Sequence, residues 1–168
     1  MLQRFYPHAY VDSAYGIDFE KLYREGYRGV IFDIDNTLVP HGAPADRGAV
    51  DLFRRLKDRG YRVMLLSNNR EPRVKSFASA VGAEYIHKAG KPGVGSYIRA
   101  MEQMHTDKSN TLFVGDQLFT DIWGANRAGI RTFLVRPVHP REEIQIVLKR
   151  LPERIVLFFY QRQLKKKG

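Results

Sequence analysis

One pattern recurs along the chain and restricts its fold more than any other feature: a helical segment ends, a glycine follows, and a short apolar run begins. Glycine just past a helix takes the left-handed conformation that other residues resist, so each recurrence predicts a helix that leads into a strand. The four joints are Glu25-Gly26-Tyr27, Arg59-Gly60-Tyr61, Val81-Gly82-Ala83 and Ala128-Gly129-Ile130. The chain should therefore alternate helices with strands.

The apolar runs are continuous, which is typical of strands covered on both faces of a parallel sheet. Helical spacing fills the segments between them, for example at Val74, Phe77 and Val81. Asp46 is placed to cap a second helix, and a third is expected to begin at Pro92. With right-handed crossovers, this predicts a three-layer Rossmann-like α/β sandwich with a mainly parallel five-stranded sheet. The predicted strands are 30–32, 63–66, 85–86, 111–114 and 132–135.

The C-terminal part of the chain departs from this alternation and is strongly basic. The net charge is +10, and from Lys149 onward there are seven basic residues and one acid. Residues 140–150 are predicted to be helical, Pro152 interrupts them, and a second helix over 153–163 would be apolar nearly all round and would bury several faces. Such an element suits an anionic surface, either membrane or nucleic acid, and a solvated basic tail is an equally good interpretation.

Length and composition predict one globular domain over residues 1–168, with a core over about 28–137 and an extension over about 140–168. The sequence has no cysteine, which excludes disulfides and thiolate metal sites and is compatible with a reducing compartment. Its longest apolar run, six residues, is far short of the about 20 that span a bilayer. No secretory signal is apparent at the N-terminus, so we expect a cytoplasmic protein.

Polar residues follow the predicted strands at their carboxyl ends, where open α/β sheets bind ligands. They are Asp33, Asp35, Asn36 and Thr37 after the first strand, Ser67, Asn68 and Asn69 after the second, and Asp116 and Asp121 after the strand over 111–114, with Lys91 just before the helix expected at Pro92. Carboxylates crowded at one edge need a cation, and an all-oxygen set suits Mg²⁺. Together these groups supply what phosphoryl transfer requires: a nucleophile, a proton donor, a metal and donors for the phosphate oxygens.

Each of these residues, taken singly, has a simpler interpretation. Asp116 and Asp121 can be ordinary helix-capping acids, Ser67 a turn residue and Lys91 a solvated lysine. The five histidines show no metal-ligand spacing. The functional interpretation depends on the conjunction of all these residues, in this order, at successive strand ends.

The same residues resemble the four motifs of the haloacid dehalogenase-like phosphatases. Asp33-Ile34-Asp35-Asn36-Thr37-Leu38 resembles the first motif, DxDxT; Ser67 after an apolar strand resembles the second; Lys91-Pro92 resembles the third; and Gly115-Asp116 with Asp121 resembles the fourth. The resemblance covers about residues 28–137.

The resemblance implies a role for each matching residue. Asp33 would be the nucleophile of a covalent aspartyl-phosphate mechanism, and Asp35 would protonate the leaving group and later activate water. Phosphate would be bound by Ser67 and Lys91, with Thr37 and Asn68 as further candidates. Magnesium would be held by the Asp33 carboxylate, the Asp35 backbone carbonyl and Asp116, with Asp121 in support.

The segments between the motifs leave no room for a cap domain, because 37–67 holds a loop, one helix and one strand, and 67–91 holds one helix and one short strand. An open site suits a bulky substrate or one presented on a surface. In this respect the chain is similar to the capless subfamily IIIA. The stretch over 2–29 and the Asp-Asn-Thr-Leu form of motif one resemble the group that includes phosphatidylglycerophosphate phosphatases. This implies a lipid phosphate monoester as substrate and a peripheral contact of the basic C-terminus with the anionic inner face of a membrane.

Two other functions stay open. A nucleotide or nucleic-acid end phosphatase fits the basic tail, but the sequence shows no nucleic-acid-binding motif, so nucleic acid is the less favoured partner. A non-catalytic phosphate-binding module that kept the fold belongs to a different class. The intact set of nucleophile, acid/base, lysine and metal aspartates argues against it.

Overall fold

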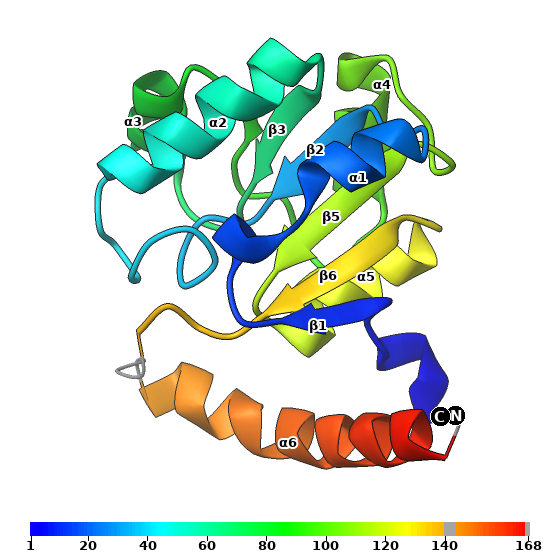
Figure 1. Cartoon of the computed structure of the whole chain (residues 1–168). Helices are drawn as coiled ribbons and strands as arrows, with labels where there is room; N and C mark the ends of the chain where they lie inside the picture. Colours follow the sequence, from blue (N-terminus) through cyan, green and yellow to red (C-terminus); the bar gives the residue numbers. More distant parts are fainter. Residues whose placement is uncertain (140–143, 167–168) are drawn as a thin grey trace.

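A computed structural model describes residues 1–139 and 144–166, with the backbone alone described over 144–149. Six parallel strands form one sheet in the order β1-β6-β5-β2-β3-β4 (Figure 1). The strands are β1 (Ala9–Val11), β2 (Gly29–Phe32), β3 (Arg62–Leu66), β4 (Glu84–Ile86), β5 (Thr111–Gly115) and β6 (Arg131–Val135). The central pair, β2 and β5, is buried along its whole length, which accounts for the continuous apolar runs.

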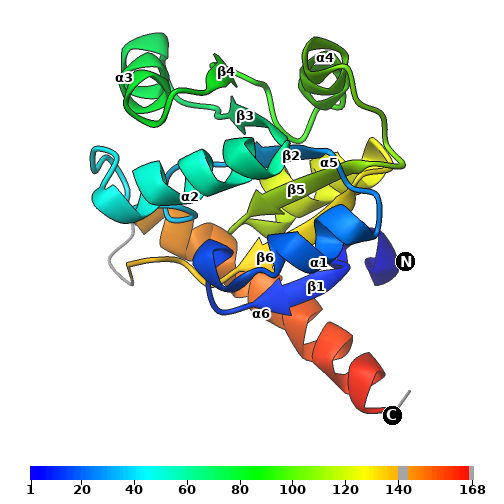
Figure 2. The same cartoon turned by 45° about the horizontal axis from the view of Figure 1, so that its top comes forward.

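Helices cover both faces of the sheet. They are α1 (Phe19–Arg24), α2 (Arg47–Arg59), α3 (Glu71–Val81), α4 (Gly95–Met104), α5 (Trp123–Arg127) and α6 (Ile144–Lys165), with the short 3-10 helices η1 (Leu2–Phe5) and η2 (Ala14–Gly16) and the π-helix η3 (Leu118–Ile122). Val30 and Phe32 pack with α1, α2 and α3, whereas Ile31 points to the opposite face and packs with α4 and α5. Figure 2 shows α1 and α2 in front of the sheet and α5 behind it. The predicted three-layer sandwich is confirmed.

The helix-to-strand joints form as predicted. All four joint glycines have positive φ, between 65° and 105°. At Gly60, for example, the left-handed conformation lets the Gly60 N–H donate hydrogen bonds to the carbonyls of Leu56 and Lys57 at the end of α2. Asp46 caps the other end of α2 by accepting a hydrogen bond from the Ala49 N–H at 2.8 Å.

The predicted strand count was one too low, because β1 was not predicted. This strand has three half-buried residues and adds to the edge of the sheet, where Tyr10 pairs with Leu134 of β6. A segment this short carries no usable periodicity. Its pairing partner lies more than 120 residues away, so only the tertiary fold identifies it as a strand.

The helix expected at Pro92 begins three residues later, at Gly95. A turn fills the interval: the Gly93 N–H donates to the Gly90 carbonyl at 2.8 Å, and the Lys91–Pro92 peptide is cis. Between Asp33 and Lys91 the chain forms only α2, β3, α3 and β4, so the expected absence of a cap insertion holds for this part of the chain.

The prediction of two C-terminal helices was wrong, because α6 runs without interruption through Pro152. A proline inside a helix loses a hydrogen bond and costs about 3 kcal/mol, a local penalty that tertiary packing offsets here. Val156 and Tyr160 are buried against η3, η1 and β6. Leu151, Ile155 and Phe158 are 55–59% exposed, so the described part of α6 buries one face and not several. Residues 140–143, which were also predicted to be helical, lie outside the described residues.

Figure 1 shows α6 beyond the edge of the sheet that β1 and β6 form. Among the described residues, we find no helix with the length and apolar character needed to cross a bilayer.

Candidate active site

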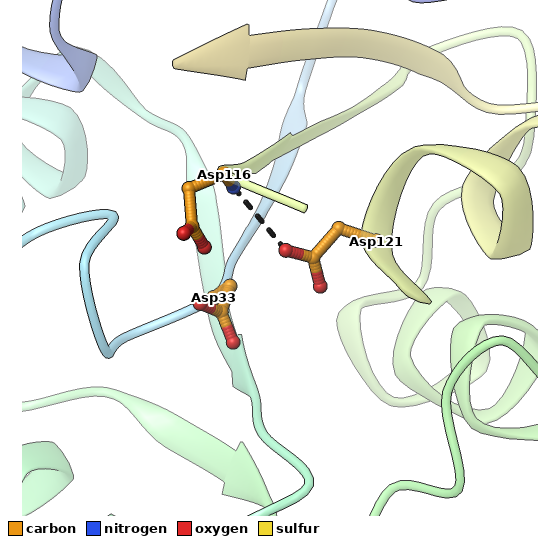
Figure 3. Close-up of side chains that lie close together, drawn as sticks. All are labelled: Asp33, Asp116 and Asp121. Atoms are coloured by element: carbon orange, nitrogen blue, oxygen red, sulfur yellow. Dashed lines mark hydrogen bonds between the residues drawn. The ribbon is translucent and has the colours of Figure 1, made fainter. Parts of the chain in front are cut away.

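Three buried aspartates meet at the carboxyl ends of the two central strands. Asp33 directly follows β2, Asp116 directly follows β5, and Asp121 lies in η3. Their side chains can each offer one oxygen within 4.8 Å of the others (Figure 3). Gly115 permits this approach, because a Cβ there would lie 2.6 Å from Asp121 Oδ2. We call these three residues the carboxylate cluster.

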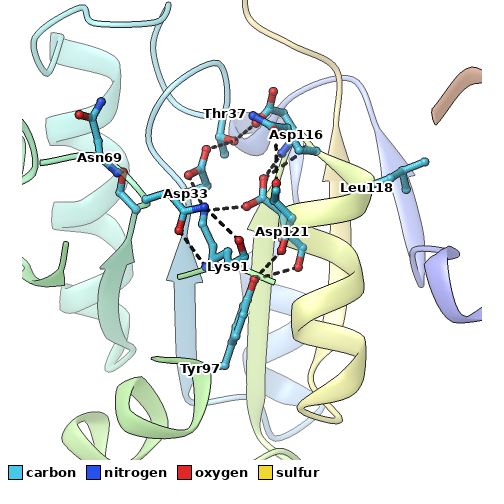
Figure 4. A network of polar contacts seen from close by, with 12 residues as sticks. Asp33, Thr37, Asn69, Lys91, Tyr97, Asp116, Leu118 and Asp121 are labelled. Carbon is cyan, nitrogen blue, oxygen red and sulfur yellow. Dashed lines mark hydrogen bonds and ion pairs between the residues drawn. The ribbon is translucent and has the colours of Figure 1, made fainter. Parts of the chain in front are cut away.

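Lys91 lies against the carboxylate cluster on the side of α4 (Figure 4). Its Nζ is 2.7 Å from Asp33 Oδ1 and 2.6 Å from Asp121 Oδ1, and its side chain is 3% exposed. Asn68 fixes the main chain of Lys91: its carboxamide accepts from the Lys91 N–H at 2.8 Å and donates to the Lys91 carbonyl at 3.1 Å. The loop after β3 therefore sets where this ammonium group lies.

Thr37 joins Asp33 to Asp116. Its hydroxyl oxygen lies 3.1 Å from Asp33 Oδ2 and 3.2 Å from Asp116 Oδ1. A hydroxyl has one hydrogen and can donate to only one of these oxygens at a time. The two carboxylates thus face each other across a gap where a further positive group is needed.

The pKa values of the site point to the same excess of negative charge. Burial raises the pKa of Asp33 to about 6; Lys91 opposes this and Asp121 adds to it. Burial, together with the charges of Asp33 and Asp121, raises the pKa of Asp116 well above its usual range. Burial acts to lower the pKa of Lys91, but the carboxylates of Asp121 and Asp33 raise it above its ordinary value. An oxygen-only cluster with this charge suits a hard divalent cation.

Asp35 occupies a different environment from Asp33. Its carboxylate accepts hydrogen bonds from the Gly42 N–H at 2.8 Å, from Arg73 at 2.9 Å and from Asn69 at 3.3 Å. Burial acts to raise the pKa of Asp35, but these three donors outweigh it and the pKa is lowered. Its side chain is not part of the carboxylate cluster.

Ser67 is buried at the end of β3, where its hydroxyl accepts from the Asn69 N–H at 3.1 Å. Within the described residues it makes no hydrogen bond to the carboxylate cluster. The structure thus brings Asp33, Thr37, Lys91, Asp116 and Asp121 into mutual contact, while Asp35, Ser67 and Asn68 border them.

Three charged residues of this site were not predicted from the sequence. Arg73, from α3, pairs with Asp35. Arg150, from α6, bonds Asp116 Oδ2 at 2.5 Å and the Asp116 carbonyl at 2.6 Å. Glu153, one turn further, accepts from Arg150 at 3.0 Å. The i,i+3 spacing of Arg150 and Glu153 was the one local signal, and it indicates only that the two can pair on a helix.

A family model described as haloacid dehalogenase-like hydrolase matches residues 41–129, more than half of the chain. The chain therefore belongs to the haloacid dehalogenase-like hydrolases, as its motifs predicted.

Relatives extend this match across almost the whole chain. "Probable phosphatase YqeG" of Bacillus subtilis is 38% identical over 165 residues, which cover 97% of this chain and 96% of that protein. Phosphatidylglycerophosphate phosphatase 1, chloroplastic/mitochondrial, of Arabidopsis thaliana is 30% identical over 95% of this chain. The match covers 48% of the plant protein, so the chain spans about half its length. The predicted assignment as a phosphatase of this family is confirmed.

A solved structure shares the fold. The cobalt-bound deoxy-D-mannose-octulosonate 8-phosphate phosphatase of Haemophilus influenzae superposes with a TM-score of 0.51 at 17% identity, covering 70% of this chain and 81% of that one. At this identity the likeness concerns the fold alone.

Proposed function

We propose that the chain is a Mg²⁺-dependent phosphomonoester hydrolase that forms an aspartyl-phosphate on Asp33. One observation carries the proposal: the carboxylates of Asp33, Asp116 and Asp121 converge beside the Lys91 ammonium at the carboxyl ends of β2 and β5. We further propose that the core over about 28–137 and the extension over about 140–168 form one catalytic domain.

In this proposal, Asp33 and Asp116 would hold the magnesium, together with the backbone carbonyl of Asp35. Asp121 supports them, because its two oxygens already bond Lys91 and the main-chain N–H groups of Asp116 and Gln117. When bound, the cation would neutralise the cluster and polarise a phosphate oxygen. Lys91, Ser67, Thr37 and Asn68 border the place where the phosphate would bind.

Asp33 would attack phosphorus, so that an Asp33–phosphorus bond forms while the ester bond breaks. Asp35 would give its proton to the leaving oxygen. In the second step, water would attack the aspartyl-phosphate and lose its proton to Asp35, which releases phosphate and restores both residues. The lowered pKa of Asp35 disfavours the protonated form that the first step uses and favours the carboxylate that accepts a proton from water in the second step.

A bulky lipid phosphate, such as phosphatidylglycerophosphate, is the substrate we propose. The similarity to the plant phosphatidylglycerophosphate phosphatase supports it. So does a cavity of about 450 Å³ that reaches Asp116 from the α6 side. Its lining combines apolar and cationic side chains, including Leu118, Leu134, Leu157, Arg136 and Arg154. This combination suits an ester that is both anionic and apolar.

The test of the chemistry is the Asp33→Asn variant, which keeps the shape of the side chain but removes the nucleophile. Phosphate release from a small soluble ester should fall by at least about 1000-fold, with folding unchanged by circular dichroism. Chelation of divalent cations should abolish wild-type activity. Undiminished turnover by Asp33→Asn would exclude Asp33 as the nucleophile.

The test of the substrate is a panel of phospholipid, nucleotide, sugar-phosphate and phosphoprotein esters. We expect the highest kcat/KM for the phospholipid. A nucleotide preferred over every lipid would instead favour a nucleotide or nucleic-acid end phosphatase. Phosphate binding without hydrolysis of any ester would indicate a non-catalytic module.

We also propose that the exposed face of α6 rests on an anionic membrane surface. Leu151, Ile155 and Phe158 follow one another at i, i+4 and i+7 and form an exposed apolar stripe. Exposed basic residues, Arg154, Arg162 and Lys165, lie on the same helix. Each Lys or Arg near an anionic surface contributes about 1 kcal/mol to binding.

Vesicle sedimentation tests this contact. The double variant Ile155→Ser, Phe158→Ser should bind phosphatidylglycerol vesicles more weakly than the wild type, and neither protein should bind phosphatidylcholine vesicles well. Ile98→Ser, which changes an exposed apolar residue of α4, is the matched control. Hydrolysis of a soluble ester checks that the site is intact. Equal sedimentation of all three proteins would exclude a role for the stripe.

A further inference from the structure

We propose that α6 is part of the cation site, with Arg150 and Glu153 as its positioning residues. This inference rests on the proposed function, because it assumes that the carboxylate cluster binds a divalent cation. The two side chains would not touch cation or substrate. They would act through Asp116 and through η3, which carries Asp121.

Arg150 grips both the side chain and the main chain of Asp116. Its Nη2 bonds Asp116 Oδ2 at 2.5 Å, and its Nη1 bonds the Asp116 carbonyl at 2.6 Å. The Asp116 side chain is fully buried and that of Arg150 is 16% exposed, so solvent screens this pair little. With Oδ2 held toward α6, Asp116 turns Oδ1 to the Thr37 hydroxyl. The guanidinium therefore selects which oxygen faces the cation position.

Glu153 fixes the next part of the same loop. It is buried, and its Oε1 accepts from the Leu118 N–H at 3.0 Å, at the first residue of η3. Its Oε2 accepts from Arg150 Nη1 at 3.0 Å, which ties the two residues together. Asp121 lies in η3. The helix α6 therefore bonds the main chain of the segment that carries both Asp116 and Asp121.

The packing of α6 against η3 places the Arg150 and Glu153 side chains at the site. Val156 is buried in one cluster with Leu118 and Ile122 of η3, and Tyr160 packs on Tyr6 with ring centroids 5.2 Å apart. The apolar and ionic contacts thus fall on the same face of the helix, toward η3.

Two physical effects of Arg150 on cation binding oppose each other. Its positive charge repels a cation, so a role through charge alone predicts tighter binding once the charge is removed. Its forked hydrogen bonds fix the Asp116 carboxylate, so a positioning role predicts weaker binding once the fork is lost. Partners that orient metal ligands typically change metal affinity by about 10–100-fold. We expect the second effect to prevail.

The experiment titrates Mg²⁺, and then Mn²⁺, into the full chain by calorimetry, with no substrate present. Arg150→Met should bind at least about 10-fold more weakly than the wild type. Arg150→Lys should lie between them, because an ammonium keeps the charge but cannot reproduce the planar fork. Glu153→Gln should weaken binding less than Arg150→Met. Arg99→Met, an exposed arginine on α4, is the matched control and should bind like the wild type.

The outcomes separate this inference from the proposed function. A wild type that binds no divalent cation would overturn the proposed cation site itself. A wild type that binds, with Arg150→Met binding equally or more tightly, would overturn only the positioning role. Circular dichroism ensures that folded proteins are compared, since a purely structural role would lower the melting temperature but not the affinity. If Arg150→Met does not fold, wild-type affinity in both Arg150→Lys and Glu153→Gln would overturn the inference.

Discussion

A positively charged side chain lies on each side of the carboxylate cluster, and the two come from different regions of the molecule. Lys91 comes from the loop before α4, inside the sandwich, and bonds two carboxylates. Arg150 comes from α6, at the edge of the sheet, and bonds both the carboxylate and the carbonyl of Asp116. Lys91 belongs to a motif of the sequence, whereas Arg150 reaches the cluster through the packing of a peripheral helix.

The two regions also differ in how firmly they are held. α2 and α3 each bury a row of apolar side chains against the sheet. Of the α6 side chains described, only Glu153, Val156 and Tyr160 are buried. Because hydrophobic stabilisation scales with buried apolar area, changes on the Lys91 side should cost more stability than changes along α6.

The largest effect on stability is expected at Lys91. Replacing it by Met leaves buried carboxylates without their ammonium partner, and breaking a buried ion pair in this way costs about 3–5 kcal/mol. Urea denaturation at pH 7.5 without divalent cations should show this loss. Lys75→Met, an exposed position on α3, should change the free energy of unfolding by about 0.5 kcal/mol or less. If the two variants are equally stable, the ammonium does not hold the cluster together.

The next effect is a dependence on pH. Because the pKa of Asp33 rises from 3.8 to about 6 in the folded chain, the folded state binds more protons than the unfolded state between these values. The free energy of unfolding of the cation-free protein should therefore fall as pH rises from about 4 to 6. At about 1.4 kcal/mol per pH unit, the contribution of Asp33 is on the order of 3 kcal/mol.

Asp33→Asn should remove this contribution, and Asp35→Asn should not, because the pKa of Asp35 is lowered and its contribution has the opposite sign. Urea titrations at several pH values check the result. Parallel pH profiles for the wild type and Asp33→Asn would contradict it.

The smallest effect compares the two faces of α6. Tyr160 is buried against Tyr6, so Tyr160→Ala should lower the free energy of unfolding by about 2 kcal/mol. Phe159 is 44% exposed, and Phe159→Ala should cost about 0.5 kcal/mol or less. Thermal denaturation measures both. Equal losses at the two positions would mean that α6 does not dock through the face described here.

Much of the molecule could be predicted from the sequence because the signals are local. The left-handed turns at Gly26 and Gly60 depend on residues a few positions away, and so does the cap that Asp46 provides. Continuous apolar runs indicated five of the six strands, β2 to β6. The conjunction of Asp33, Lys91 and Asp116 at strand ends indicated where they would meet, because parallel strands direct their carboxyl ends to one edge.

Three features arose only in the tertiary structure. The strand β1 depends on pairing with β6, and no periodicity in three residues could indicate it. The helix α6 continues through Pro152 because its packing offsets the local cost of a proline inside a helix. The interruption predicted from the sequence considered that local cost alone. The contact of Arg150 with Asp116 joins residues 34 positions apart in sequence through the docking of that helix.

The sequence by itself determined the alternating α/β fold, the family and the acidic edge of the sheet, since each follows from spacing along a short stretch of chain. The tertiary structure decided how the charges are balanced there. A buried charge interacts with whatever packing brings within a few ångströms, and distance along the chain does not limit it. Lys91 could be predicted because it belongs to a sequence motif. Packing alone places the other three charged residues at the site, namely Arg73, Arg150 and Glu153, so they could not be predicted.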